Sequence, residues 1–122
     1  MKIFIVDDDA KVIKLITMVL EAAGHEVASD TVSSSALDQI LEGRPDCVIT
    51  DLMMTGMDGL ALIGQLRAQP SLREVKIVMV SAKTNPMWEA KARDAGADGF
   101  IGKPLDVQSF AGTIEKIVGG VT

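Results

Sequence analysis

Three runs of apolar residues, each about the length of a buried strand, limit most strongly what this chain can fold into. They are Ile3 to Val6, Cys47 to Ile49 and Ile77 to Val80, and segments with helical periodicity separate them. Because these runs do not alternate polar with apolar residues, they predict strands that helices cover on both faces. The order of strands and helices therefore predicts an α/β fold with a parallel sheet.

Weaker patterns complete the predicted order of elements. Val27 with its neighbours and Gly99 to Gly102 predict two shorter strands. Helices are predicted over Lys11 to Ala23, over Ser33 to Glu42, and from a cap at Asp58 to about Arg67. A fourth helix is predicted through Trp88, Ala92 and Ala95 before Gly96. A fifth is predicted after Asp106, and its side chains that face the sheet are Phe110, Ile114, Ile117 and Val118. We expect one domain over residues 1–122, in which 119–122 are a free tail or the start of a linker.

Composition and charge exclude several classes of protein. No apolar run approaches the length of a membrane span, and the first residues lack the apolar core of a secretory signal, so we expect a soluble, cytoplasmic protein. The net charge is −5 and no cluster of Lys and Arg is present, which argues against direct binding to nucleic acid or to a membrane. Cys47 is the only cysteine and lies in an apolar run, so we expect a buried, reduced thiol.

Charged and hydroxyl side chains follow the predicted strands at the points where each strand ends. Asp7 to Asp9 follow the first strand, Asp51 the third, Ser81 the fourth and Lys103 the fifth. The carboxyl ends of parallel strands meet at one edge of the sheet, so these side chains should converge on one cleft. Neighbouring carboxylates repel one another unless a hard cation such as Mg²⁺ and a fixed ammonium offset their charge. The sequence therefore predicts a site where phosphate is placed on a carboxylate.

The resemblance of this chain to a known family is carried, in order, by the segments VDDD, ITDLMMTGMDG, VSA and GKP. Together they resemble the receiver domain of two-component response regulators over essentially the whole chain. The resemblance implies a doubly wound (βα)5 fold in three layers, with a flavodoxin-like strand order 2-1-3-4-5. It also implies a signalling domain, not a dedicated catalyst, that takes a phosphoryl group from a sensor histidine kinase or a histidine phosphotransferase. Such a domain is a monomer or weak dimer and acts on a downstream protein target.

Carried over residue by residue, the resemblance implies that Asp51 is the phosphoacceptor. It implies that Mg²⁺, or Mn²⁺ in its place, is bound by the carboxylates of Asp8 and Asp51, by the backbone carbonyl of Met53, and by Asp7 through water. A cation at this point suits the chemistry, because a dianionic phosphoryl donor cannot approach several carboxylates unaided.

The same resemblance assigns roles at the ends of the fourth and fifth strands. Lys103 would contact the phosphoryl group and Asp51, and the Lys103–Pro104 peptide bond would be cis. Ser81 would donate its hydroxyl to another phosphoryl oxygen. Phe100 occupies the position of the switch aromatic of the family, and it would turn inward when Ser81 moves toward phosphate. This motion would repack the surface of the fourth helix, fifth strand and fifth helix.

Some residues depart from the family pattern or have a plainer interpretation. Thr55 stands where receivers usually have proline, so the surrounding loop is expected to be more mobile. Met53 and Lys83 flank the expected path of hydrolytic water, and the apolar Met53 predicts slower dephosphorylation than in a Met53→Asn variant. Asp9 and Asp58 are interpreted as helix caps. His25, directly after a helix-stopping glycine, is interpreted as a surface turn residue.

The sequence is also compatible with other functions, to different degrees. The chain could be a receiver excised from a larger regulator or hybrid kinase, or a pseudo-receiver that binds partners without phosphorylation. An aspartate-nucleophile phosphatase would need a second acid two residues after Asp51, where this chain has Met53. A flavodoxin-like nucleotide binder would need a loop of small residues after the first strand, where this chain has three acids.

Overall fold

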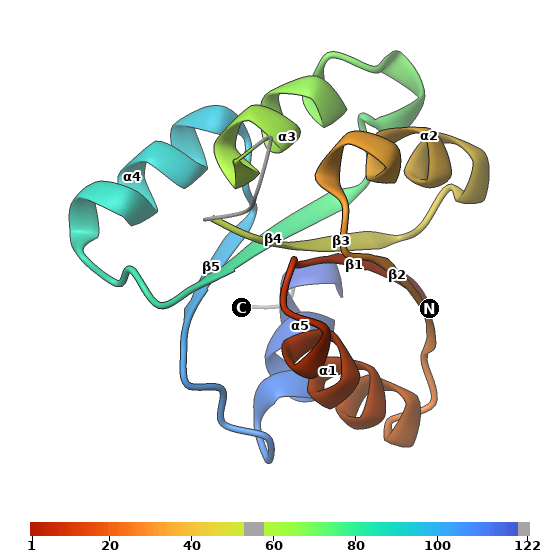
Figure 1. Cartoon of the computed structure of the whole chain (residues 1–122), viewed down its shortest axis with the longest axis vertical. Coiled ribbons are helices and arrows are strands. Elements are labelled where there is room, and N and C mark those ends of the chain that lie inside the picture. Colours follow the sequence, from red (N-terminus) through yellow and green to blue (C-terminus); the bar gives the residue numbers. More distant parts are fainter. Residues whose placement is uncertain (53–57, 120–122) are drawn as a thin grey trace.

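A parallel sheet lies at the centre of the computed structural model, which describes residues 1–52 and 58–119 (Figure 1). Across the described residues its strand order is β2-β1-β3-β4-β5, with every neighbouring pair parallel. The strands are β1 (Lys2–Val6), β2 (Glu26–Asp30), β3 (Cys47–Asp51), β4 (Lys76–Ser81) and β5 (Gly99–Gly102). The predicted sheet and its order are confirmed.

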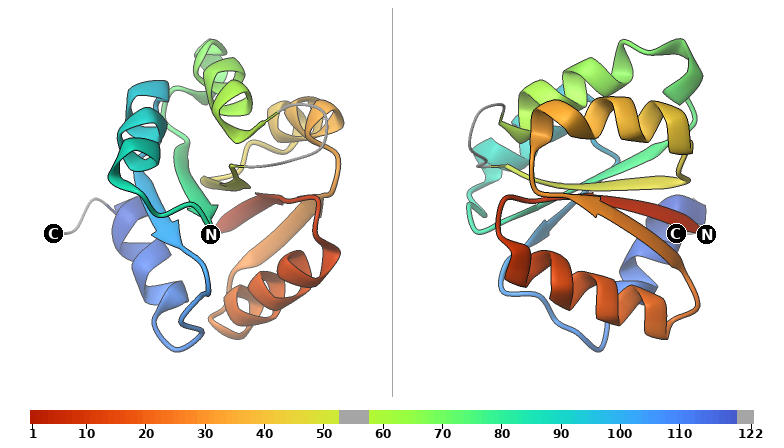
Figure 2. Two further views of the ribbon diagram at one scale, coloured as in Figure 1. Left: turned by 60° about the vertical axis from the view of Figure 1, so that its left-hand side comes forward. Right: turned by 45° about the vertical axis from the view of Figure 1, so that its right-hand side comes forward.

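Helices cover both faces of this sheet and complete the three layers of the predicted fold. In two views, α2, α3 and α4 lie on one face of the sheet, whereas α1 and α5 lie on the other (Figures 1 and 2). Their bounds are α1 (Ala10–Ala22), α2 (Ser33–Gly43), α3 (Gly59–Arg67), α4 (Pro86–Ala95) and α5 (Phe110–Gly119), and a short 3-10 helix, η1 (Pro70–Leu72), precedes β4. No helix in the part of the chain that the structure describes is long and apolar enough to cross a membrane.

Alternate side chains of the central strands enter two different cores, which explains their continuous apolar sequences. Val6 and Val48 belong to the core under α2, α3 and α4, whereas Ile5 and Ile49 belong to the core under α1 and α5. All four side chains are almost completely buried. Burying both faces is favourable only where polar residues are absent, and this is why the strands could be recognised from their sequences.

The lone cysteine is part of the second core. The Cys47 side chain is completely buried, and its thiol is free. Burial raises the pKa of this thiol to about 12, and the carboxylates of Asp98 and Asp46 add to that effect. A thiol with so high a pKa is protonated at neutral pH and is therefore a poor nucleophile, in agreement with the predicted buried, reduced residue.

Helix ends follow the expected signals. The side chains of Asp9 and Asp58 accept hydrogen bonds from backbone N–H groups in the first turns of α1 and α3, so both are the helix caps that the sequence predicts. Gly24 and Gly96 follow α1 and α4 with φ of 93° and 121°, a conformation that disfavours other residues.

The last helix begins later than predicted. Asp106 accepts a hydrogen bond from the Gln108 N–H through Oδ1, at 3.0 Å, and its carbonyl accepts from the N–H groups of Ser109 and Phe110. The local bonds of Asp106 thus hold 107–109 in a turn, and regular helix starts only at Phe110.

His25 follows the turn at Gly24, but the prediction of a surface residue is wrong for its side chain. That side chain is 11% exposed, and its Nε2 lies 2.7 Å from Glu115 Oε2 on α5. Its Nδ1 lies 3.2 Å from the Met1 nitrogen. The ring therefore contacts both the first residue of the chain and α5.

Candidate functional site

Two neighbouring strands bring distant acids to the same edge of the sheet. Asp7 directly follows β1, and Asp51 is the last residue of β3, which pairs with β1. The carboxyl ends of both strands lie at one side of the molecule (Figure 2). Carboxylate oxygens of Asp7, Asp8 and Asp51 all lie within 4.8 Å of one another. The predicted convergence of these three residues is therefore present in the structure.

The backbone holds two of these carboxylates in place. Asp7 is 2% exposed, and its Oδ1 accepts a hydrogen bond of 2.9 Å from the Asp9 N–H. The Asp51 side chain is 12% exposed, and its Oδ1 accepts a bond of 2.9 Å from the Leu52 N–H. Asp8 lies at the exposed rim of the group. The group thus opens to solvent on one side while its inner carboxylates keep fixed directions.

One lysine faces the acids, as predicted. The Lys103 Nζ lies 3.3 Å from Asp7 Oδ2 and 3.5 Å from Asp51 Oδ1. The Lys103 N–H donates to the carbonyl of Ser81 at 2.8 Å, which ties the residue after β5 to the end of β4. The Lys103–Pro104 peptide bond is cis. The ammonium therefore bridges the two inner carboxylates of the group.

The surroundings of Asp51 disfavour its charged form. Burial raises the pKa of the Asp51 carboxyl, and the nearby charge of Asp7 raises it further. The Lys103 ammonium and the Leu52 N–H act in the opposite direction, but the pKa of Asp51 stays above its ordinary value. Burial and the charge of Asp7 therefore outweigh the effect of the single ammonium, and a further cation beside Asp51 would lower this pKa.

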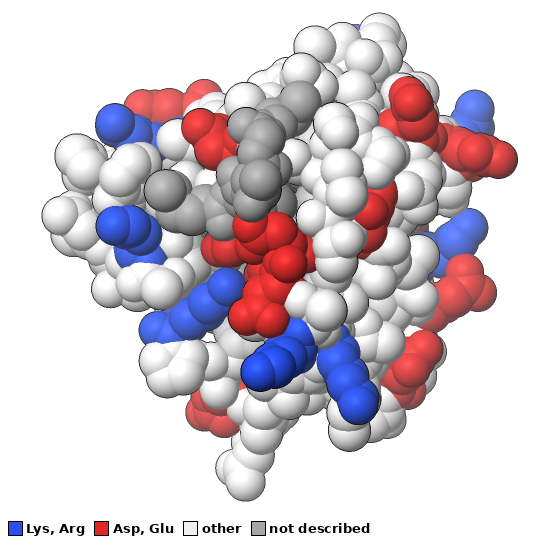
Figure 3. Space-filling view, viewed as in Figure 1, with Lys and Arg blue, Asp and Glu red and all other residues white. Residues whose placement is uncertain are grey.

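The donor set fits a hard divalent cation. Three carboxylates and one ammonium carry a net charge of about −2 when all are ionised. Their oxygen atoms are the ligand type that Mg²⁺ and Mn²⁺ prefer, and Mg²⁺ typically uses only one or two protein carboxylates beside water. Acidic side chains gather in the middle of one face of the molecule, with basic side chains beside them (Figure 3). Asp7, Asp8 and Asp51 could therefore hold such an ion.

Ser81 and Phe100 lie on two paired strands beside the acids. Ser81 is the last residue of β4 and 1% exposed, and its Oγ accepts a hydrogen bond of 2.9 Å from the Lys83 N–H. Phe100 on β5 pairs with Met79, which is two residues before Ser81. Phe100 is half-buried and packs with Trp88 against the core under α3 and α4. A change at Ser81 can thus reach Phe100 through one strand pair.

Two residues with predicted roles lie outside the described residues. The proposed backbone ligand Met53 belongs to residues 53–57, and so does Thr55, which replaces the usual proline. The predictions about metal binding by the Met53 carbonyl, water access at Met53 and loop mobility at Thr55 stay predictions.

One residue at the site was not predicted from the sequence. Gly59, the first residue of α3, is the last residue of the segment ITDLMMTGMDG and had no expected role of its own. In the structure it is buried, and a Cβ atom built on it would lie 2.0 Å from the backbone oxygen of Asp51. A glycine eight positions after a strand-end aspartate is the only signal the sequence offers, and the spacing alone does not reveal such close contact.

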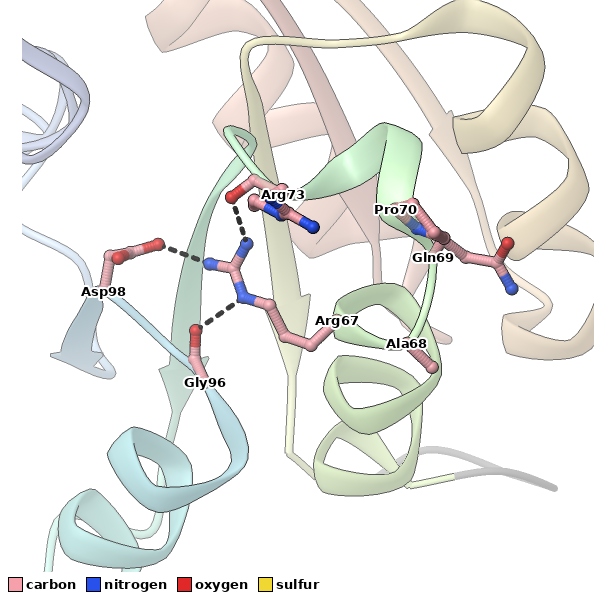
Figure 4. A pocket seen from close by; sticks show the side chains of 7 residues that line it. All are labelled: Arg67, Ala68, Gln69, Pro70, Arg73, Gly96 and Asp98. Carbon is pink, nitrogen blue, oxygen red and sulfur yellow. Dashed lines mark hydrogen bonds and ion pairs between the residues drawn. The ribbon is translucent and has the colours of Figure 1, made fainter.

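A polar pocket lies away from the acidic group, between the end of α3 and the residues that precede β5 (Figure 4). Arg67 at the end of α3 dominates it: Nη2 lies 2.7 Å from Asp98 Oδ2, Nε donates to the Gly96 carbonyl at 3.0 Å, and Nη1 donates to the Val75 carbonyl at 2.7 Å. The remaining lining residues are Ala68, Gln69, Pro70 and Arg73. Because the protein itself accepts the hydrogen bonds of Arg67, this pocket is best explained as a structural junction between α3, α4 and β4.

Comparison with known proteins agrees with this geometry. The family model described as "Response regulator receiver domain" matches residues 3–115. The chain is 39% identical over 104 residues to the DNA-binding response regulator MtrA of Mycobacterium tuberculosis, covering 85% of this chain and 44% of that protein. It is 30% identical over 117 residues to the polar-differentiation response regulator DivK of Brucella anthropi, covering 96% of this chain and 95% of DivK. The chain thus spans less than half the length of the MtrA proteins it matches.

Solved structures show the same architecture. A response regulator of Chloroflexus aurantiacus superimposes with a TM-score of 0.92 at 30% identity, and the match covers 97% of each chain. The chemotaxis response regulator CheY4 of Vibrio cholerae superimposes with a TM-score of 0.90 at 26% identity, covering 95% of this chain and 97% of that one.

Proposed function

Because the chain belongs to the response regulator receiver family, we propose that it is switched by phosphorylation of Asp51. The observation that carries this proposal is the group of three carboxylates within 4.8 Å of one another, with the Lys103 Nζ between Asp7 and Asp51. The donor would be the phosphohistidine of a sensor histidine kinase or of a histidine phosphotransferase. We further propose that the entire chain is one receiver domain and that its output is contact with another protein.

In the proposed reaction, a carboxylate oxygen of Asp51 attacks the phosphorus atom of the donor. The new O–P bond forms as the N–P bond breaks, and the electron pair of that bond leaves with the histidine of the partner. Lys103 would balance charge on the phosphoryl group as a fixed point charge, and Ser81 would donate its hydroxyl to another phosphoryl oxygen. Bound Mg²⁺ or Mn²⁺ would neutralise the phosphoryl oxygens and allow the anionic donor to approach.

Switching would then follow from the packing between β4 and β5. When Ser81 moves toward the phosphoryl group, the space behind it becomes available to Phe100, which lies on the paired strand. The ring leaves its half-exposed position, and the surface formed by α4, β5 and α5 repacks. Crystals grown with and without beryllofluoride, a phosphoryl mimic, should show different rotamers of Phe100. The same rotamer in both would contradict this switch.

The pseudo-receiver interpretation is less well supported. A domain that had lost phosphorylation would not be expected to keep every charged group of the site. This chain keeps Asp7, Asp8, Asp51 and Lys103, and the described structure holds them within direct electrostatic reach of one another.

The proposal can be tested without knowing the partner kinase. Purified protein is incubated with acetyl phosphate and Mg²⁺, and its intact mass is measured beside an Asp51→Asn variant and a sample without Mg²⁺. We expect a gain of one phosphoryl group in the parent only, and only with Mg²⁺. No gain of mass in the parent would reject phosphorylation and would favour the pseudo-receiver interpretation instead.

A further inference from the structure

The first residue of α3 touches the backbone of the proposed phosphoacceptor. The Gly59 N–H donates to the Leu52 carbonyl at 2.8 Å. A Cβ atom on Gly59 would lie 2.0 Å from the Asp51 backbone oxygen, and 3.0 Å from both the Asp51 carbonyl carbon and the Met79 Cε. Real Cβ atoms essentially never come closer than 3.0 Å to such atoms. Any residue larger than glycine would therefore force Asp51 and α3 apart by about 1 Å.

The reason for glycine at this position is space and not backbone conformation. The φ of Gly59 lies outside the positive range that glycine alone adopts easily, in contrast to Gly24 and Gly96. Gly64 lies on the same helix, and a Cβ atom built there would meet nothing within 4 Å. The close approach is therefore specific to the end of α3 that faces Asp51.

We propose that Gly59 is a positioning residue for phosphoryl transfer, a role that rests on the proposed function of Asp51. Its contact holds the Asp51 carbonyl and the Leu52 carbonyl against the start of α3. The Leu52 N–H in turn donates to Asp51 Oδ1 at 2.9 Å, so the same peptide segment directs the carboxylate. Gly59 would thus hold the Asp51 carboxylate in position for the phosphoryl donor without contacting the donor itself.

A shift of this size has a large kinetic consequence. Displacing a reacting group by about 1 Å can slow a reaction by about a hundredfold, even when the group itself is unchanged. A Gly59→Ala variant should therefore react about tenfold to a hundredfold more slowly at saturating acetyl phosphate and Mg²⁺. The loss should appear in the maximal rate, because Asp7, Asp8 and Lys103 remain to bind the metal and the donor.

The test compares the parent with Gly59→Ala and with the matched variant Gly64→Ala. Urea denaturation at several temperatures first identifies a temperature at which each variant is folded in the absence of urea. The rate of phosphorylation by acetyl phosphate is then measured at that temperature by intact mass. We expect Gly64→Ala to react at the rate of the parent and folded Gly59→Ala to be slow at saturation. Folded Gly59→Ala that reacts at the parental rate would overturn the positioning role while leaving the proposed function intact. A parent that is not phosphorylated would instead reject the proposed function, and this role with it.

A measurement on the parent keeps the inference testable if Gly59→Ala does not fold. Hydrogen exchange reports whether the bonds from the Gly59 and Leu52 N–H groups persist in solution. Both amides should exchange as slowly as those of β3. Exchange at the rate of an unprotected amide would show that the contact does not hold Asp51, and the role would be rejected.

Discussion

Asp51 carries a charge that its own surroundings disfavour. Burial and the neighbouring Asp7 raise the pKa of its carboxyl, and Lys103 compensates only in part. A buried group of like charges costs stability in the resting protein, which is common at functional sites. With Asp51 as the proposed phosphoacceptor, the same arrangement would favour the binding of a divalent cation, which in turn would allow an anionic phosphoryl donor to approach.

The charge of Asp51 predicts a pH-dependent gain in stability on substitution. Because the folded state raises the pKa of Asp51, folding favours the protonated carboxyl, and ionisation of Asp51 lowers stability as pH rises through that raised pKa. Asp51→Asn should therefore raise the free energy of unfolding by about 1 kcal/mol at pH 7 without divalent cations. The gain should shrink as pH falls through the raised pKa of Asp51. Urea denaturation of both proteins across pH checks this, with the exposed Asp94→Asn as control, and a variant less stable than the parent at pH 7 would contradict it.

Among the elements, α2 has its start hydrogen-bonded to one carboxylate of the sheet. The residue before this helix, Val32, provides no side-chain cap, but the Asp30 carboxylate at the end of β2 accepts hydrogen bonds from the Val32 N–H, the Ser35 hydroxyl and the Gln39 amide. Burial raises the pKa of Asp30, but these hydrogen bonds outweigh that effect and leave the pKa below its ordinary value. Ionised Asp30 therefore stabilises the start of α2.

This attachment predicts the opposite pH dependence from that of Asp51. Because the folded state lowers the pKa of Asp30, its contribution is complete above about pH 3.9, the ordinary pKa of aspartate, and is lost as pH falls through the lowered value. Asp30→Asn should cost about 1 kcal/mol at pH 7, and less under more acidic conditions, because an amide cannot accept the bonds of Ser35 and Gln39 as a charged carboxylate does. Urea denaturation measures the difference, and Asp38→Asn on the exposed side of the same helix should change little. A cost for Asp30→Asn that stays constant down to pH 2 would be inconsistent with a stabilising role of the ionised carboxylate.

How far the sequence predicts an element depends on whether its cause is local. Strands β1, β3 and β4 were recognisable because burial on both faces requires apolar runs. The start of α5 was misplaced even though its cause is local, because residues after an aspartate such as Asp106 can form either a turn or the first turn of a helix. The role of Gly59 was hidden for a different reason: only the approach of α3 to β3 in space shows that a side chain there would strike Asp51. Likewise, His25 follows a glycine turn as expected, but its burial depends on α5, which lies far along the chain.

In the molecule as a whole, the parallel sheet explains why the residues that converge at the site could be predicted from the sequence. Strand order places the ends of β1 and β3 side by side, and the ends of β4 and β5 follow beside them. Residues far apart in sequence therefore had to converge once the strands were recognised. The distances, the burial of Asp7 and the bridging position of Lys103 depend on packing and could not be read from the sequence.

The acidic group should couple metal binding to the stability of the whole molecule. A cation that binds only the folded state stabilises it by about 2.7 kcal/mol when its concentration is a hundred times the dissociation constant. Mg²⁺ should therefore raise the urea midpoint of the parent at pH 7, and the increase should be much smaller in Asp51→Asn. Sodium chloride at equal ionic strength controls for screening. An increase that is the same in both proteins would place the cation elsewhere.

The most direct test of phosphorylation at Asp51 is to locate the phosphoryl group chemically. Protein phosphorylated with acetyl phosphate and Mg²⁺ is treated with borohydride, which reduces an aspartyl phosphate to homoserine, and the digested peptides are sequenced by mass spectrometry. We expect homoserine at position 51 and at no other aspartate. Homoserine at Asp7 or Asp8, or at no position despite a measured gain of phosphate, would contradict the assignment of Asp51 as the phosphoacceptor.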